Sequence, residues 1–222
     1  MATARIYIEV GKSKCFASSV EWPGWSRSAK TEADAIDTLL EYAPRYAAVL
    51  KGRVSGFKTP GSVVVTERVK GDTGTDYGVP GQEYPADSKR IIGKELERQI
   101  AVLQACWAYF IKVARKHDGA ELRKGPRGGG RDLDGVIDHV LGADAAYVGA
   151  LGGKAKPNGD DPLADLRRVH QTFIDTLHGR IDGSVSAVGP RGGSKWPIRF
   201  ALRYVAWHAL DHAWEIEDRV LA

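Results

Sequence analysis

Residues 204–219 read YVAWHALDHAWEIEDR, and this stretch decides how the rest of the chain is interpreted. It contains neither Gly nor Pro, and its spacing of apolar residues at steps of three and four predicts an amphipathic helix. His208 and His212 stand four residues apart, so both lie on the shoulder of the apolar stripe, with His212 nearer its centre. Two imidazoles there, joined by a ligand from another helix, suit a divalent metal. Two half-buried surface histidines are the alternative interpretation.

Three more amphipathic helices precede this stretch. Apolar residues recur at helical steps in 89–116, 132–151 and 162–177, and the last helix extends over 197–221. The third of the four has Asp161 as its N-cap and Pro162 at its first helical position. Four such helices joined by loops predict a four-helix bundle over residues 88–222, which we expect to run up-down-up-down.

The N-terminal part has a different pattern, which predicts a small α+β domain over residues 1–70. Residues 4–9, 15–20 and 63–69 are typical of strands. Thr31 is typical of an N-cap, and Pro44 interrupts the helix that follows it. Residues 71–87 are rich in Gly, Pro and Asp without a period, so we interpret them as a linker. The fold class predicted for the whole chain is α+β.

Length and composition bound the function. The 222 residues can bury a sizeable core, and a formal charge of +4 does not by itself favour a nucleic-acid partner. No long apolar run or secretory leader is present, so we expect a cytoplasmic protein without a membrane partner. Cys15 and Cys106 lie in different elements without CxxC spacing, and we expect both to be free, packed thiols.

Further candidate residues lie in the second and fourth helices of the bundle. His139 lies on the shoulder of its apolar stripe, as His208 does on the fourth helix. Asp144 falls near the middle of that stripe, where a carboxylate needs a partner such as a metal-bound histidine, an arginine or a helix terminus. Glu215 follows His212 by three residues and could orient it or act as a general base. Pairing of Glu215 with Arg219 at i+4 is the alternative.

Two loops share the word GPRGG, at residues 125–129 and 189–193, each before a helix. In an up-down-up-down bundle these two loops lie at one end. Helix N-termini with nearby arginines attract anions, so Arg127 and Arg191 are candidates for binding an acidic cofactor or substrate. Two solvated, flexible loops are the alternative.

Part of the N-terminal sequence resembles a known module. FASSVEWPGW at 16–25 and TEADAIDTLLEYA at 31–43 resemble the HicB-like module, a reduced ribonuclease-H-like fold. Ribonuclease-H chemistry needs clustered carboxylates for two metals, and this stretch lacks them at a suitable spacing. The resemblance therefore implies the fold and not the catalysis.

The C-terminal part carries a second resemblance. IDHVLGADAAYVGAL at 137–151 and RYVAWHALDHAWEIEDR at 203–219 resemble the DinB-like (YfiT-like) superfamily of metalloenzymes. That superfamily includes thiol-dependent transferases and maleylpyruvate isomerases that use mycothiol or bacillithiol. The resemblance implies that His139, His208 and His212 hold a divalent metal, commonly zinc or nickel. It also implies a low-molecular-weight thiol as a further cofactor, a small-molecule substrate and a homodimer as one form of assembly.

From these observations we expect a metal-dependent, thiol-dependent transferase or isomerase. Two alternatives stay open. One is a non-catalytic binding or regulatory protein that uses the HicB-like domain and carries a vestigial metal site. The other is a metal-dependent hydrolase, in which a metal-bound hydroxide takes the place of the thiolate.

Overall fold

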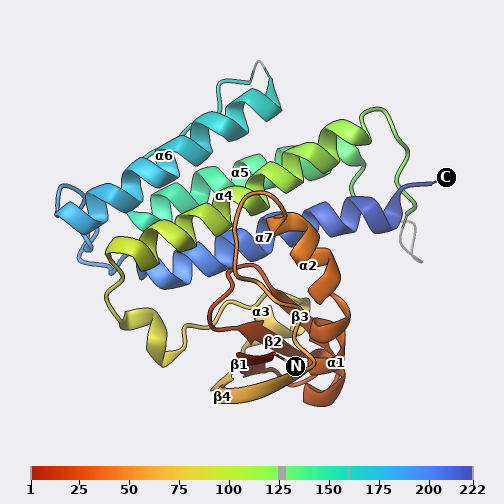
Figure 1. Ribbon diagram of the computed structural model, residues 1–222. Coiled ribbons are helices and arrows are strands. Elements are labelled where there is room, and N and C mark those ends of the chain that lie inside the picture. Colours follow the sequence, from red (N-terminus) through yellow and green to blue (C-terminus); the bar gives the residue numbers. More distant parts are fainter. Residues whose placement is uncertain (1, 125–128, 160, 222) are drawn as a thin grey trace. The chain divides into compact units, whose positions relative to one another are not determined.

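The computed structural model of the protein describes residues 2–124, 129–159 and 161–221 (Figure 1). Helices predominate among these residues, and four strands form one sheet, so the predicted α+β class is confirmed. The strands are β1 (Thr3–Val10), β2 (Cys15–Ser19), β3 (Ser26–Ala29) and β4 (Ser62–Lys70). The helices are α1 (Glu32–Glu41), α2 (Ala43–Leu50), α3 (Thr73–Tyr77), the 3-10 helix η1 (Pro85–Ser88), α4 (Gly93–Lys116), α5 (Leu133–Leu151), α6 (Pro162–Asp182) and α7 (Ile198–Arg219).

The chain forms two compact units. Unit 1 comprises the residues up to Cys106 together with Leu202–Trp207, and unit 2 comprises Trp107–Ala201 and the residues from His208 onward. Helices α4 and α7 therefore contribute residues to both units. These units differ from the bounds 1–70, 71–87 and 88–222, which stay a prediction about how the chain is organised in domains. None of the described helices is both long and apolar enough to span a membrane.

Unit 1 is built on a sheet with the strand order β3-β2-β1-β4. β1 and β2 form an antiparallel hairpin, whose turn is closed by the Gly11 amide donating to Lys14 O at 2.9 Å. β4 pairs in parallel with β1, with an irregularity in register between Ile6 and Tyr7. The three predicted strands lie within one residue of their expected ends. β3 was not predicted, because its sequence SRSA lacks apolar alternation and its place is set by pairing with β2.

The first two helices begin where the sequence predicts. Thr31 Oγ1 accepts a hydrogen bond from the Asp34 amide at 3.1 Å and so caps α1. Pro44 lies in the first turn of α2, where its missing N–H leaves no helical hydrogen bond unmade. Leu39 of α1 is buried, and its carbonyl accepts from Trp25 Nε1 at 2.9 Å. This contact ties the helix to the chain that leads into β3.

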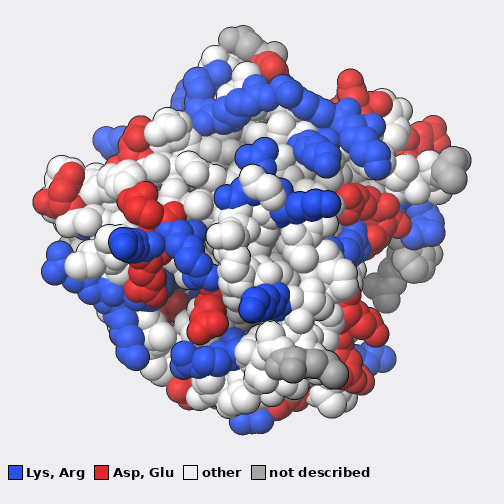
Figure 2. Space-filling view, viewed as in Figure 1, with Lys and Arg blue, Asp and Glu red and all other residues white. Residues whose placement is uncertain are grey.

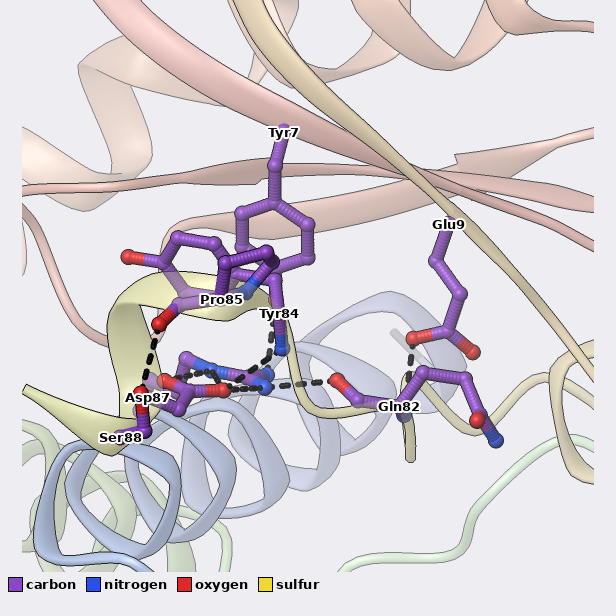
Figure 3. Close-up of polar contacts among 8 residues, drawn as sticks. Tyr7, Glu9, Gln82, Tyr84, Pro85, Asp87 and Ser88 are labelled. Carbon is purple, nitrogen blue, oxygen red and sulfur yellow. Dashed lines mark hydrogen bonds and ion pairs between the residues drawn. The ribbon is translucent and has the colours of Figure 1, made fainter.

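The segment 71–87, interpreted from the sequence as a linker, contains α3 and the start of η1 and bonds to β1 within unit 1. Glu9 of β1 is fully buried and accepts a hydrogen bond from Thr75 Oγ1 at 2.5 Å. It also accepts one from the Gln82 amide at 3.1 Å (Figure 3). Burial raises the pKa of the Glu9 carboxyl. The segment thus supplies the donors that a buried carboxyl requires, a role that its composition does not reveal.

Arg203 of α7 also belongs to unit 1, where its side chain is almost enclosed. The guanidinium forms an ion pair with Asp87, donates to Tyr7 Oη at 2.7 Å and donates to Gln82 O at 2.7 Å. The rings of Tyr7 and Tyr84 stack beside it, with centroids 4.4 Å apart (Figure 3). Although burial opposes its charge, Tyr7 and Asp87 hold the pKa of Arg203 above its ordinary range. These contacts attach one turn of α7 to β1 and to residues 82–87.

Side-chain caps begin α5 and α6, and of these the sequence predicts Asp161. Asp132 accepts from the Gly135 amide at 2.8 Å to cap α5, and Asp161 accepts from the amides of Leu163 and Ala164 to cap α6. Gly152 ends α5 with a φ of 113°, a left-handed conformation that favours glycine.

Helices α5 and α6 run parallel to each other, so the expected up-down-up-down topology is wrong. Asp144 in the second half of α5 contacts His170 of α6, and Leu151 at the end of α5 contacts Arg180 near the end of α6. Contacts that advance in the same direction along both helices define a parallel pair. Ten residues, 152–161, connect the two helices, and the length of this connection alone permits either direction.

Packing and surface charge agree with the composition. Cys15 and Cys106 are both buried and free, as expected. Trp207 is buried in unit 1, with its ring edge-on to Phe16 of β2 at a centroid distance of 6.1 Å.

The face shown in Figure 2 carries acidic and basic side chains intermingled, which fits a net formal charge of only +4.

Candidate metal centre

Three histidines of unit 2 come together between α5 and α7. One ring nitrogen from each of His139, His208 and His212 lies within 4.8 Å of the others. His139 comes from α5, and the other two stand one turn apart on α7. The three rings therefore converge as the sequence predicts, and their role as metal ligands stays a prediction.

The spacing of the nitrogens suits a small divalent ion. His139 Nε2 and His208 Nε2 are 3.3 Å apart. Two imidazole nitrogens that each lie about 2.0–2.1 Å from a tetrahedral zinc are separated by about 3.3 Å. The ring centroid of His212 lies 4.8 Å from that of His139 and 4.6 Å from that of His208. His139 and His208 therefore already have the separation that a shared ion requires.

Burial favours the neutral, metal-binding form of His208 and His139. His208 is only 5 % exposed, and burial lowers its pKa well below the ordinary value, with further lowering by the positive charges of His212 and His139. Burial, His212 and then Arg131 likewise lower the pKa of His139. Neutral imidazole is the form that binds a metal. The expectation that His212 lies nearer the apolar centre is wrong, because His208 is the more buried of the two.

Glu215 contacts both of the partners considered for it. Its Oε2 lies 2.7 Å from His212 Nδ1, and its Oε1 forms an ion pair with Arg219. The hydrogen bond from His212 is the main reason that the pKa of Glu215 is lowered. A protonated Nδ1 that donates to this carboxylate leaves the lone pair of His212 on Nε2, facing the cluster.

Arg219 extends this contact to the chain that leads into α5. Its Nε donates to Arg123 O at 3.0 Å and its Nη2 donates to Arg131 O at 2.7 Å. Arg131 directly precedes Asp132, the N-cap of α5. Arg219 therefore joins the end of the helix that carries His208 and His212 to the start of the helix that carries His139.

Asp144 has the buried position expected for it, and its partner is His170 of α6. The two side chains meet at 2.8 Å between Asp144 Oδ2 and His170 Nε2. Among the described residues, Asp144 Oδ1 is buried without a hydrogen-bond partner, and burial raises the pKa of this carboxyl. The His170 ring stacks on Trp107 with centroids 4.0 Å apart. Sequence reasoning missed His170, although its position among the apolar residues Val169 and Phe173 was a signal.

The prediction of an anion site assumed that the loops before α5 and α7 lie at the same end of the bundle, and the structure does not have that arrangement. Arg127 lies outside the described residues. Arg191 is exposed in a turn before α7, and Trp196 in the same loop donates its amide to Ala150 O at the end of α5. Arg131, from the other loop, lies at the start of α5, which has 19 residues and spans about 28 Å. The described parts of the two loops therefore lie at opposite ends of α5.

Comparison with known proteins identified no relative of this chain. No protein-family model, no curated protein and no solved structure matches this chain. The HicB-like and DinB-like resemblances therefore stay predictions, and the function has to be argued from the three histidines and their surroundings.

Proposed function

We propose that the protein is an enzyme whose reaction takes place at a divalent ion held by His139, His208 and His212. The observation that carries the proposal is the convergence of three ring nitrogens within 4.8 Å. Among the described residues, no fourth histidine, cysteine or carboxylate belongs to this cluster. Structural zinc sites normally have four protein ligands, whereas catalytic sites have three and keep a position open. The donor set therefore favours a catalytic ion.

The chemistry that we propose at this ion is thiol transfer or isomerisation, with hydrolysis as the alternative. A divalent ion lowers the pKa of a thiol or water bound to it, so that a thiolate or hydroxide forms near neutral pH. Both oxygens of Glu215 are engaged, one by His212 and one by Arg219. This carboxylate is therefore suited to orienting His212 and less suited to taking a proton from a water. We propose zinc or nickel as the ion and a low-molecular-weight thiol as the second cofactor, which attacks an electrophilic small molecule.

The metal content of the purified protein tests the first part of the proposal. Wild-type protein should bind about one equivalent of zinc or nickel, and His208→Ala should lose it. His178→Ala is a matched control, because His178 is exposed on α6. Equal metal content in the wild type and His208→Ala would remove the proposal. It would leave the binding or regulatory protein with a vestigial site as the better interpretation.

A second measurement separates transfer from hydrolysis. Metal-loaded protein is mixed with an electrophile and with mycothiol, bacillithiol or glutathione, and the products are identified by mass spectrometry. A transferase consumes one thiol for each conjugate formed, and an isomerase requires the thiol without consuming it. A hydrolase turns its substrate over in the absence of any thiol.

A further inference from the structure

Within unit 2, three aromatic side chains form a series of ring contacts that begins at His208 of the histidine cluster; they are Tyr147, Trp196 and Phe200. The Tyr147 ring stands nearly perpendicular to that of His208, with centroids 5.4 Å apart. The Trp196 ring lies 5.4 Å from Tyr147, with the planes 34° apart, and Phe200 follows 5.0 Å from Trp196. Phe200 is buried, whereas Tyr147 and Trp196 are each half-buried. Part of two large aromatic surfaces is therefore accessible beside a candidate metal ligand.

The Trp196 ring stands on a well-anchored backbone. The Trp196 amide donates to Ala150 O at 3.0 Å, and its carbonyl accepts from Arg180 Nη1 at 3.2 Å. The same Nη1 donates to Leu151 O at 2.8 Å, so one guanidinium joins this loop to the end of α5. Tyr147 is on α5 itself, two turns beyond His139. A pair of rings held in this way loses little conformational freedom when a ligand binds.

We propose that Tyr147 and Trp196 form a subsite for a planar, apolar group of the substrate. The polar end of that substrate, an oxygen donor such as a carbonyl, binds at the three histidines. This inference rests on the proposed function, because the histidines locate the reacting end. The Tyr147 ring centroid lies 5.4 Å from that of His208. A single planar ring joined to a carbonyl group is therefore long enough to contact Tyr147 while its oxygen binds at the histidines. The substrate class is therefore a small aromatic or conjugated electrophile.

Two hydroxamates test the subsite directly. A hydroxamate binds divalent metals through its two oxygens, so acetohydroxamate reports the metal alone, and benzohydroxamate adds a planar apolar ring. Binding of both to the zinc-loaded protein is measured by calorimetry, together with metal content. Stacking on an aromatic face adds to the gain from burying the ring, so we expect benzohydroxamate to bind about tenfold more tightly, which corresponds to about 1.4 kcal/mol.

Substitutions at Tyr147 and Trp196 test whether these two rings cause the tighter binding of benzohydroxamate. In Tyr147→Leu and Trp196→Leu the preference for benzohydroxamate should fall to about twofold or less, while acetohydroxamate affinity and metal content stay unchanged. Tyr147→Phe, which keeps the ring, should retain the preference. Tyr77→Leu is the matched control, because Tyr77 is 83 % exposed in α3, and it should behave as the wild type.

The outcomes distinguish this inference from the proposed function. Wild-type protein that holds no metal would overturn the proposed function and the subsite with it. Protein that holds metal, but binds the two hydroxamates equally or not at all, would overturn the subsite alone. A preference that persists in both leucine variants would also overturn it. If one leucine variant fails to fold or loses its metal, the other decides the result.

Discussion

His212 Nδ1 lies 2.7 Å from Oε2 of Glu215, one turn further along α7. The other oxygen of that carboxylate pairs with Arg219, which is four residues beyond Glu215 on the same helix. Residues three and four apart on a helix are neighbours, so α7 builds the whole chain of contacts by itself. The lone pair of His212 is thereby directed to Nε2. In the proposed site, Glu215 would therefore act on the metal through His212, without binding the metal itself.

Glu215→Gln should weaken metal binding while leaving the fold intact. A partner that orients a metal-bound histidine typically contributes 10- to 100-fold to metal affinity, so we expect a loss of about that size. The measurement is competition for zinc with a chromogenic chelator. Glu97→Gln, at an exposed position of α4, is the control and should leave the affinity unchanged. An unaltered affinity in Glu215→Gln would show that the carboxylate does not orient His212.

The apo protein should become less stable as the pH falls below about 6.5. Burial and the neighbouring positive charges lower the pKa of His208 and of His139 from the ordinary value of 6.5. The unfolded chain therefore takes up protons at a higher pH than the folded one. Stability rises with pH wherever the unfolded state binds more protons. The contribution of these histidines is fully present above 6.5 and is lost as the pH falls through their folded-state pKa values.

Urea unfolding of metal-free protein between pH 5 and pH 7.5 measures this dependence. His208→Gln removes one of the titrating groups and should make stability less dependent on pH, whereas His178→Gln, at the exposed position on α6, should not. Zinc-loaded protein should lose more stability on acidification, because protons compete with the metal for the ring nitrogens. If His208→Gln had the same pH dependence as the wild type, His208 would not be the group that couples folding to protons.

The sequence predicts the cluster of three histidines but does not predict that Asp144 pairs with His170, because the two depend on different kinds of spacing. His208 and His212 share a helix, so their spacing alone places them together, and His139 follows from the resemblance and from its place on the stripe. The pairing of Asp144 with His170 depends instead on the register and direction of α6 against α5. The connection 152–161 permits either direction, so periodicity could predict only that Asp144 needs a partner.

The same limit applies to unit 1. The four residues of β3 carry no apolar alternation, so only pairing with β2 makes them a strand. Residues 71–87 have the composition of a loop, and their contacts with Glu9 depend on a carboxylate that lies far away in the sequence. A local pattern predicts local structure, whereas hydrogen bonds between distant residues become visible only in the fold.

His170→Ala should destabilise the protein strongly at neutral pH. The substitution removes the hydrogen bond that His170 makes to Asp144, which is 2 % exposed, and it removes the stacking on Trp107. Breaking a buried pair by removing one partner typically costs about 3–5 kcal/mol. Chemical denaturation measures the loss, and His178→Ala on the same helix is the control.

The deficit of His170→Ala should shrink as the pH falls. Burial already raises the pKa of Asp144, and His170 opposes that rise. Without the histidine, protonation of the carboxyl becomes easier. A raised folded-state pKa lowers stability progressively as the pH rises from the unfolded-state pKa of the carboxyl to its folded-state pKa. The difference between His170→Ala and His178→Ala should therefore be larger at pH 7 than at pH 5. Equal deficits at both values would show that lost packing, and not the buried charge, accounts for the effect.

Arg203→Ala should be among the most destabilising single changes in unit 1. It removes the ion-pair partner of Asp87, which is 2 % exposed, and the donor to Tyr7 Oη. A buried carboxylate left unpaired typically costs about 3–5 kcal/mol, whereas Arg167→Ala, at an exposed site on α6, should change stability by about 0.5 kcal/mol or less. Arg203→Lys keeps the charge but not the planar fork, so it should fall between them. If Arg203→Lys were as stable as the wild type, charge alone would hold Asp87, and the directed bonds to Tyr7 and Gln82 would contribute nothing.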